Sequence, residues 1–110
     1  MTRLLSALTT LTLVFAALPA SAQEIYVRSA YLTDSNGYNY GARFWLDSTV
    51  NAVTCVVPRV VERTNVNGDV AGPFLLQPNE KGVNIGSFIS ADRSKPWNVD
   101  VGAKWKEGDC

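Results

Sequence analysis

The chain has 110 residues, of which 46% are hydrophobic, 10% aromatic and 18% charged, and its ten basic side chains equal its ten acidic ones in number. This length suits a single domain, and the balanced charge argues against a nucleic-acid partner. The sequence has no histidine, so the commonest general base and metal ligand is missing. Two cysteines are too few for a four-thiolate zinc site. We therefore predict no metal and no cofactor.

Residues 1–22 have the pattern of a secretory signal peptide. A basic residue near the start precedes an apolar run over residues 4–18, and small residues at positions 20 and 22 form a cleavage site. The alternative is an N-terminal membrane anchor, but the apolar run is short for a span. The sequence predicts cleavage before Gln23, export to the periplasm or the outside, a single domain over residues 23–110, and no stable membrane span after cleavage.

Cys55 and Cys110 are the only cysteines. In an oxidising compartment, two thiols most simply pair with each other. A redox or catalytic thiol is the other interpretation, but the chain has neither a Cys-x-x-Cys motif nor a histidine to activate a thiolate. We predict an intramolecular disulfide, with intermolecular pairing as the alternative.

The rest of the chain has the pattern of short strands separated by turns. Alternation of apolar and polar residues predicts six strands, at residues 24–32, 42–49, 52–64, 73–77, 83–90 and 97–106. Turn residues predict connections at residues 33–41, 65–72 and 78–82, the first two centred on Asn36-Gly37 and Asn67-Gly68. This pattern predicts an all-β fold, a small antiparallel β-sandwich or barrel of roughly six or seven strands. It resembles an immunoglobulin-like sandwich, although the internal Cys–Trp–Cys spacing is absent.

The alternation also predicts which side chains face the core. In residues 42–49, Phe44 and Leu46 share a face opposite Arg43, Trp45 and Asp47. In residues 52–64, a shared face of Val53, Cys55 and Val57 places the thiol toward the core. In residues 83–90, Val83, Ile85 and Ser87 are expected opposite Asn84, Gly86 and Phe88. In residues 97–106, one apolar face is expected, formed by Trp97, Val99, Val101, Ala103 and Trp105.

Pro58 interrupts the third predicted strand. Proline cannot donate to a ladder, so we expect an edge position, a bulge or a break there.

The polar residues do not form a catalytic pattern. The acidic residues are scattered through turns and solvent faces, and Ser48 and Thr49 lack a base to activate a hydroxyl. Residues 34–37 resemble a calcium loop only superficially, because the glycine and the later ligand positions do not fit. We therefore predict a protein that is not an enzyme.

The aromatic residues give the best candidate binding site. Tyr38 and Tyr40 lie in a turn-rich segment, and Arg43 and Trp45 share the polar face of the strand that follows. Tyrosine on a loop and an exposed tryptophan both suit recognition of a partner. The alternatives are that one tyrosine folds back over the core edge and that Trp45 packs in the core.

These observations predict a small exported binding domain that engages a protein or a surface polysaccharide through loops and an exposed sheet face. Two alternatives stay open. One is an inhibitor or immunity protein against a secreted enzyme, which requires a protruding, ordered loop. The other is a strand-donating structural subunit, which requires an open sheet edge.

Overall fold

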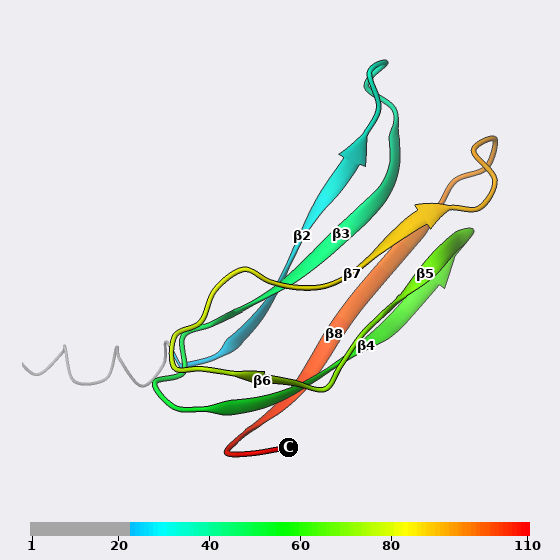
Figure 1. Cartoon of the computed structure of the whole chain (residues 1–110). Helices are drawn as coiled ribbons and strands as arrows, with labels where there is room; N and C mark the ends of the chain where they lie inside the picture. Colours follow the sequence, from blue (N-terminus) through cyan, green and yellow to red (C-terminus); the bar gives the residue numbers. More distant parts are fainter. Residues whose placement is uncertain (1–22) are drawn as a thin grey trace, which may run out of the picture.

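A computed structural model describes residues 23–110, which form seven strands in two antiparallel sheets (Figure 1). The strands are β2 (Ile25–Thr33), β3 (Asn39–Ser48), β4 (Thr54–Thr64), β5 (Val66–Val70), β6 (Phe74–Leu76), β7 (Val83–Ser90) and β8 (Asn98–Glu107). The predicted all-β, antiparallel class is therefore confirmed. The predicted signal peptide, residues 1–22, lies outside the described residues. Within residues 23–110, no helix is long and apolar enough to cross a membrane.

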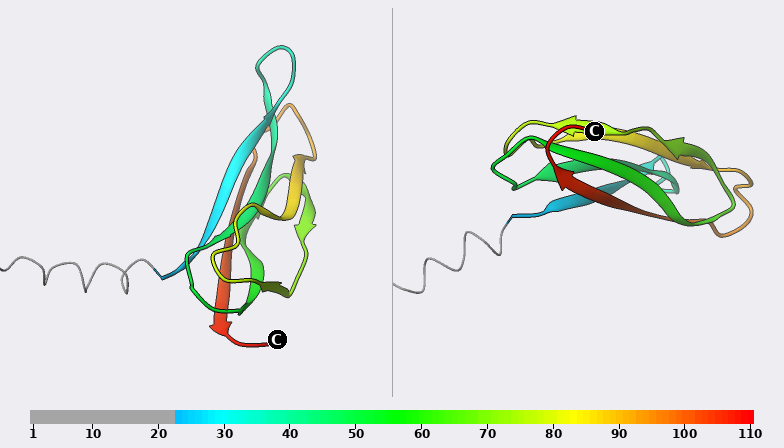
Figure 2. Two further views of the ribbon diagram at one scale, coloured as in Figure 1. Left: turned by 60° about the vertical axis from the view of Figure 1, so that its left-hand side comes forward. Right: turned by 90° about the horizontal axis from the view of Figure 1, so that it is seen from below.

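The two sheets form two layers (Figure 2), and one hydrophobic core lies between them. The four-stranded sheet has the order β2-β3-β7-β5, and the three-stranded sheet has the order β6-β4-β8. The buried members of the core come from both sheets and are Ala42, Phe44, Leu46, Val56, Val66, Leu76, Ile85, Phe88 and Val101. Burial of these apolar side chains is the main favourable term for such a fold.

The hairpin between β2 and β3 turns where the sequence predicts. Gly37 has a φ of +82°, a conformation that side chains disfavour, and its N–H donates to Asp34 O at 3.0 Å. The carboxylate of Asp34 also accepts hydrogen bonds from the backbone N–H groups of Asn36 and Tyr38, at 2.9 and 3.0 Å. This loop projects beyond the ends of the other strands (Figure 1).

The second predicted turn, residues 65–72, is wrong in extent. The chain reverses at Asn65, which takes a φ of 53°, and β5 follows directly. The amide of Asn65 supports this sharp reversal by donating to Asp92 O at 2.8 Å and accepting from Asp92 N at 2.9 Å. Gly68 therefore lies within a strand, opposite Phe88, where a Cβ atom would come within 2.4 Å of Ser87 O. The Asn67-Gly68 pair marks a close approach of two strands rather than a turn.

The predicted facing of β7 is wrong beyond Gly86. Ile85 and Phe88 are both fully buried, although strict alternation places them on opposite faces. The register between β3 and β7 shifts at this point, so that the strand gains one residue and its later side chains change face. Gly86 makes the shift possible, because its φ is +152° and a Cβ there would lie 2.4 Å from Asp69 O.

The predicted disulfide joins Cys55 to Cys110, with an S–S distance of 2.14 Å and a Cα–Cα distance of 5.0 Å. The predicted facing of Cys55 is wrong, because Val56 and not Cys55 belongs to the core. Cys55 lies on the outer face of the three-stranded sheet with Val57, which is 49% exposed. Cys55 is nevertheless buried, since the C-terminal cysteine is bonded to it there.

Pro58 sits inside β4 without a break, paired with Ala103 of β8. Gly108 N donates to Val53 O at 2.8 Å, so the odd-numbered residues of this part of β4 hydrogen-bond to β8. The missing donor of Pro58 therefore points to the other side, beyond the end of β6, which pairs only with Thr54 to Val56. At this residue β4 is locally an edge strand.

The predicted apolar face of β8 is right at its centre and wrong at one end. Val101 is buried, and Trp97, Val99 and Ala103 pack partly buried against the core. Trp105, predicted in the core, is 39% exposed. Because β8 is the last strand of its sheet, a side chain near its end has neighbours on one side only.

Candidate functional site

Arg43 and Trp45 lie on the outer face of the four-stranded sheet. Phe44 and Leu46, between and beside them, point into the core, so the predicted facing of this strand is correct. Trp45 is half-buried and lies directly opposite Arg28 of β2. The guanidinium carbon of Arg28 is 4.9 Å from the centroid of the indole, a cation–π arrangement.

Asp47 completes a small polar cluster around this tryptophan. Its carboxylate accepts a hydrogen bond from Arg28 Nε at 2.8 Å and another from Gly82 N at 2.8 Å. These bonds, that from Arg28 above all, hold the pKa of the Asp47 carboxyl below its ordinary value. The ion pair fixes Arg28 over the ring, so Trp45 is held in place and is partly covered by its own domain.

Tyr38 lies at the end of the molecule, apart from Trp45. Trp45 is seven positions further along the chain, nearly all of them in β3, which corresponds to about 23 Å at roughly 3.3 Å per residue. Arg93, from the connection between β7 and β8, places its guanidinium carbon 4.4 Å from the centroid of the Tyr38 ring and forms an ion pair with Asp34 at 2.7 Å. The hydroxyl of Tyr38 donates to Arg93 O at 3.3 Å. Tyr38 thus joins two loops.

The bond from Arg93 and the backbone bonds from Tyr38 and Asn36 keep the pKa of Asp34 below its ordinary value. Tyr40 is half-buried near the register shift of the β2–β3 hairpin. The four predicted residues are therefore spread out, with Arg43 and Trp45 on the outer sheet face and Tyr38 at the loops. Tyr40, predicted in a turn, lies instead in β3. Their role in binding stays a prediction.

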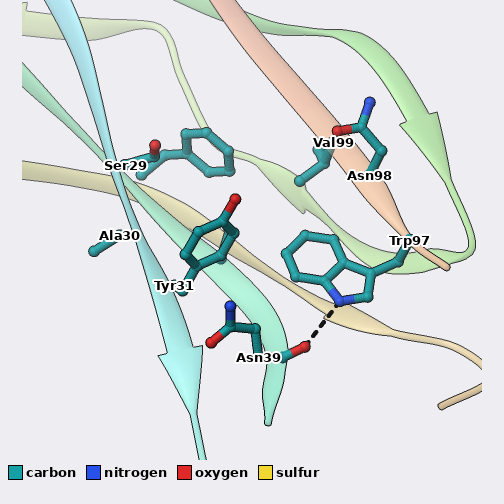
Figure 3. A pocket seen from close by; sticks show the side chains of 9 residues that line it. Ser29, Ala30, Tyr31, Asn39, Trp97, Asn98 and Val99 are labelled. Atoms are coloured by element: carbon teal, nitrogen blue, oxygen red, sulfur yellow. Dashed lines mark hydrogen bonds between the residues drawn. The ribbon is translucent and has the colours of Figure 1, made fainter. Parts of the chain in front are cut away.

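A cavity of about 390 Å³ lies between the two sheets, on the side where β2 and β8 are the outermost strands (Figure 3). Ala42 and Phe44 bring core surface to it, and the remaining lining residues are Ser29, Ala30, Tyr31, Asn39, Trp97, Asn98 and Val99. Every one of these side chains is uncharged. The cavity thus extends inward to two residues of the hydrophobic core, each of which is 5% exposed.

Two aromatic rings from different sheets flank the cavity. Tyr31 of β2 and Trp97, just before β8, have ring centroids 6.0 Å apart and an interplanar angle of 81°. The indole N–H of Trp97 donates to Asn39 O at 2.9 Å, which orients the ring (Figure 3). Tyr31 is less buried than Trp97. It is 68% exposed, although its side chain is on the face of β2 that is directed toward the core.

Sequence reasoning missed this cavity because Trp97 matched a core position in the alternation of residues 97–106 and Tyr31 was assigned no role. Ser29 was the available signal. It places a hydroxyl in the inner row of β2, between Val27 and Tyr31, where a continuous core would favour an apolar side chain.

The cavity offers aromatic surface, amides and a hydroxyl, which suit an uncharged group that is partly apolar and partly hydrogen-bonding. Among residues 23–110, no three or more side chains of the metal-binding types come together in a possible metal site. Comparison of the chain with family models, with curated proteins and with solved structures found no match.

Proposed function

We propose that this chain is a small exported binding domain, not an enzyme, with an immunoglobulin-like sandwich that engages a protein partner through the cavity between β2 and β8. The observation that carries the proposal is a cavity of about 390 Å³ that is flanked by Tyr31 and Trp97 and lined at its inner side by the core residues Ala42 and Phe44. Partly exposed aromatic rings beside an apolar floor are typical of anchor sites for a partner's side chain.

A protein partner suits this cavity better than a polysaccharide. Sugar rings stack on flat aromatic faces, whereas Tyr31 and Trp97 meet edge to face at 81°. Two rings at this angle suit the insertion of a single apolar side chain of the partner. Asn39 and Asn98, which also line the cavity, suit hydrogen bonds to the partner's backbone.

Export is the second element of the proposal. The disulfide between Cys55 and Cys110 is of the kind that persists in oxidising compartments, and residues 1–22 have the composition of a signal peptide. We expect the intact mass of the protein recovered from periplasm or culture fluid to match a chain that starts at Gln23 and has lost two hydrogens to the disulfide. A mass that retains residues 1–22 would contradict this part of the proposal.

The binding proposal is tested with two tyrosines of β2. Tyr31 lines the cavity, whereas Tyr26 is also exposed but lies on the outer face of the same strand. We expect Tyr31→Ala to weaken recovery of the partner from periplasmic fluid, and then its measured affinity, by about tenfold or more, as for an aromatic anchor. Tyr26→Ala should leave both unchanged.

Two outcomes of that experiment would overturn the cavity as the binding site. One is equal affinity for the wild type and Tyr31→Ala. The other is loss of binding with Trp45→Ala alone, which would assign recognition to the outer sheet face instead.

The inhibitor alternative is supported by a different observation. The β2–β3 loop projects from the molecule and is held by the ion pair between Asp34 and Arg93 (Figure 1). A projecting loop that is ordered before binding loses little entropy when it enters an enzyme's cleft. In that case affinity would depend on residues 35–37 rather than on Tyr31.

A further inference from the structure

We propose that the free edge of β2 is a self-association surface, at which two copies of this chain pair their β2 strands antiparallel and join two four-stranded sheets into one. This inference does not rest on the proposed function, because it concerns the backbone edge of β2 and a second copy of the same chain.

The backbone of β2 is in a conformation ready for pairing. Thr49 N donates to Glu24 O at 2.9 Å, and Ile25 lies opposite Ser48 in the next position of the ladder. Hydrogen-bonded and non-bonded pairs alternate in an antiparallel ladder, so the even-numbered residues of β2 bond to β3. The odd-numbered residues direct their N–H and C=O groups to the free edge, and these are Ile25, Val27, Ser29 and Tyr31. Within residues 23–110, no strand pairs with that edge.

The edge of β2 also lacks the features that keep sheet edges apart. Proteins protect such edges with short strands, bulges, proline or unpaired charges, lysine above all. β2 has nine residues, no proline and no lysine, and its pairing with β3 stays in register from Ile25 to Leu32. Its one charged side chain, Arg28, is neutralised by Asp47 at 2.8 Å.

The other outermost strands of the two sheets do have such protection. β6 has three residues, and β5 has five, including Gly68 at a φ of +130°. β8 is long, but Asp100, Lys104, Lys106 and Glu107 give it charges of both signs. β2 is therefore the edge that is best suited to accept a further strand.

A second copy suits this edge by charge and by register. Apart from Arg28, whose charge is paired with Asp47 at 2.8 Å, β2 consists of uncharged residues, and it pairs best with a strand of the same kind, such as β2 of a second copy. With the two-fold axis at Ser29, Arg28 of one copy lies opposite Ala30 of the other, so the two arginines do not oppose each other. Tyr31 then lies opposite Val27 of the second copy, and an aromatic side chain beside a β-branched one is a favourable cross-strand pair.

The test compares one charge change at two exposed serines. Ser29 lies at the free edge of β2, and Ser87 lies on β7, which is paired on both sides. Sedimentation equilibrium of the purified wild-type protein should give a concentration-dependent mass that approaches twice that of the chain. Ser29→Lys should raise the dimer dissociation constant at least tenfold, whereas Ser87→Lys should leave it unchanged.

A second measurement reads the backbone directly. Hydrogen exchange at the amides of Val27 and Ser29 should be slow at high protein concentration and fast on dilution. Circular dichroism of each variant establishes whether it is folded before the dissociation constants are compared. A wild-type chain that is monomeric up to millimolar concentration would overturn the proposal, as would equal dimerisation of both variants or equal loss of dimer in both.

Because Tyr31 belongs both to the cavity and to the proposed strand pairing, Tyr31→Ala is measured by sedimentation as well as by partner affinity. Weaker partner binding with an unchanged dimer dissociation constant would support the cavity alone, whereas a weaker dimer with unchanged partner binding would support the strand pairing alone.

Discussion

Replacing Cys110 with serine is expected to lower the free energy of unfolding by about 4 kcal/mol. The disulfide closes a loop with a sequence separation of 55 residues, and a crosslink over a loop of that size lowers the entropy of the unfolded chain by an amount worth about 4 kcal/mol. A domain of this size has few kilocalories to lose, since net stability is about 5–15 kcal/mol. The variant should therefore be largely unfolded at modest temperature or urea concentration.

Urea unfolding followed by circular dichroism measures this effect. Reductant supplies the matched control, because it should destabilise the wild type to the level of Cys110→Ser and leave the variant unchanged. A difference below about 1 kcal/mol between the oxidised wild type and the variant would show that the unfolded chain gains little freedom when the crosslink is absent.

Phe88→Ala is expected to cost about 3–5 kcal/mol, the usual loss for a fully buried phenylalanine. Phe88 has no exposed surface, and its ring meets Phe44 edge to face with centroids 5.8 Å apart. Gly68 lies opposite it on β5 and has no side chain that could fill the space, and the Arg63 guanidinium, whose carbon is 5.4 Å from the ring centroid, is too polar to replace the lost apolar contacts. The cavity left by the substitution should therefore stay open.

Ile89 is the matched control for this substitution, because it is the next residue on the same strand and is 48% exposed. Ile89→Ala should change the free energy of unfolding by less than about 1 kcal/mol. Thermal unfolding of both variants measures the contrast. Equal losses, or a larger loss at Ile89, would mean that the strand does not change face at Gly86.

The facing of side chains was predicted correctly where apolar and polar residues alternate along the strand without interruption. In β3 the apolar residues stay in phase from Ala42 to Leu46, and each of the three is buried. In β7 the alternation was followed through Gly86, where the chain gains a residue, so the facing of Phe88 was wrong. A glycine in a strand-like segment can mark a turn, a bulge or a close approach of two backbones. Which of these it marks depends on the residues that surround it in the folded protein.

The candidate site was harder to predict than the strands. The facing of Arg43 and Trp45 follows from one strand, and it was correct. The cavity depends on the separation between β2 and β8, which belong to different sheets and lie more than sixty residues apart in the chain. Neither Tyr31 nor Trp97 carries a local sign of that separation. The outward facing of Cys55 was missed for a related reason, since a disulfide can bury a residue outside the core.

The loops at the Tyr38 end are of two kinds, although both are largely exposed. The segment 91–96 is joined to its surroundings at several points, through the Asn65 amide, the Asp34–Arg93 ion pair and the neighbouring indole of Trp97. The tip of the β2–β3 hairpin is different, because beyond Asp34 it has open space around it: a Cβ atom added to Gly37 would meet no atom within 4 Å, although the φ of +82° requires that Gly37 itself be kept. For a protein engineer who wishes to graft a peptide onto this scaffold, the hairpin tip is the tolerant position. Solvent exposure alone does not distinguish the two loops as insertion sites, because residues 35–37 and 91–96 are all exposed.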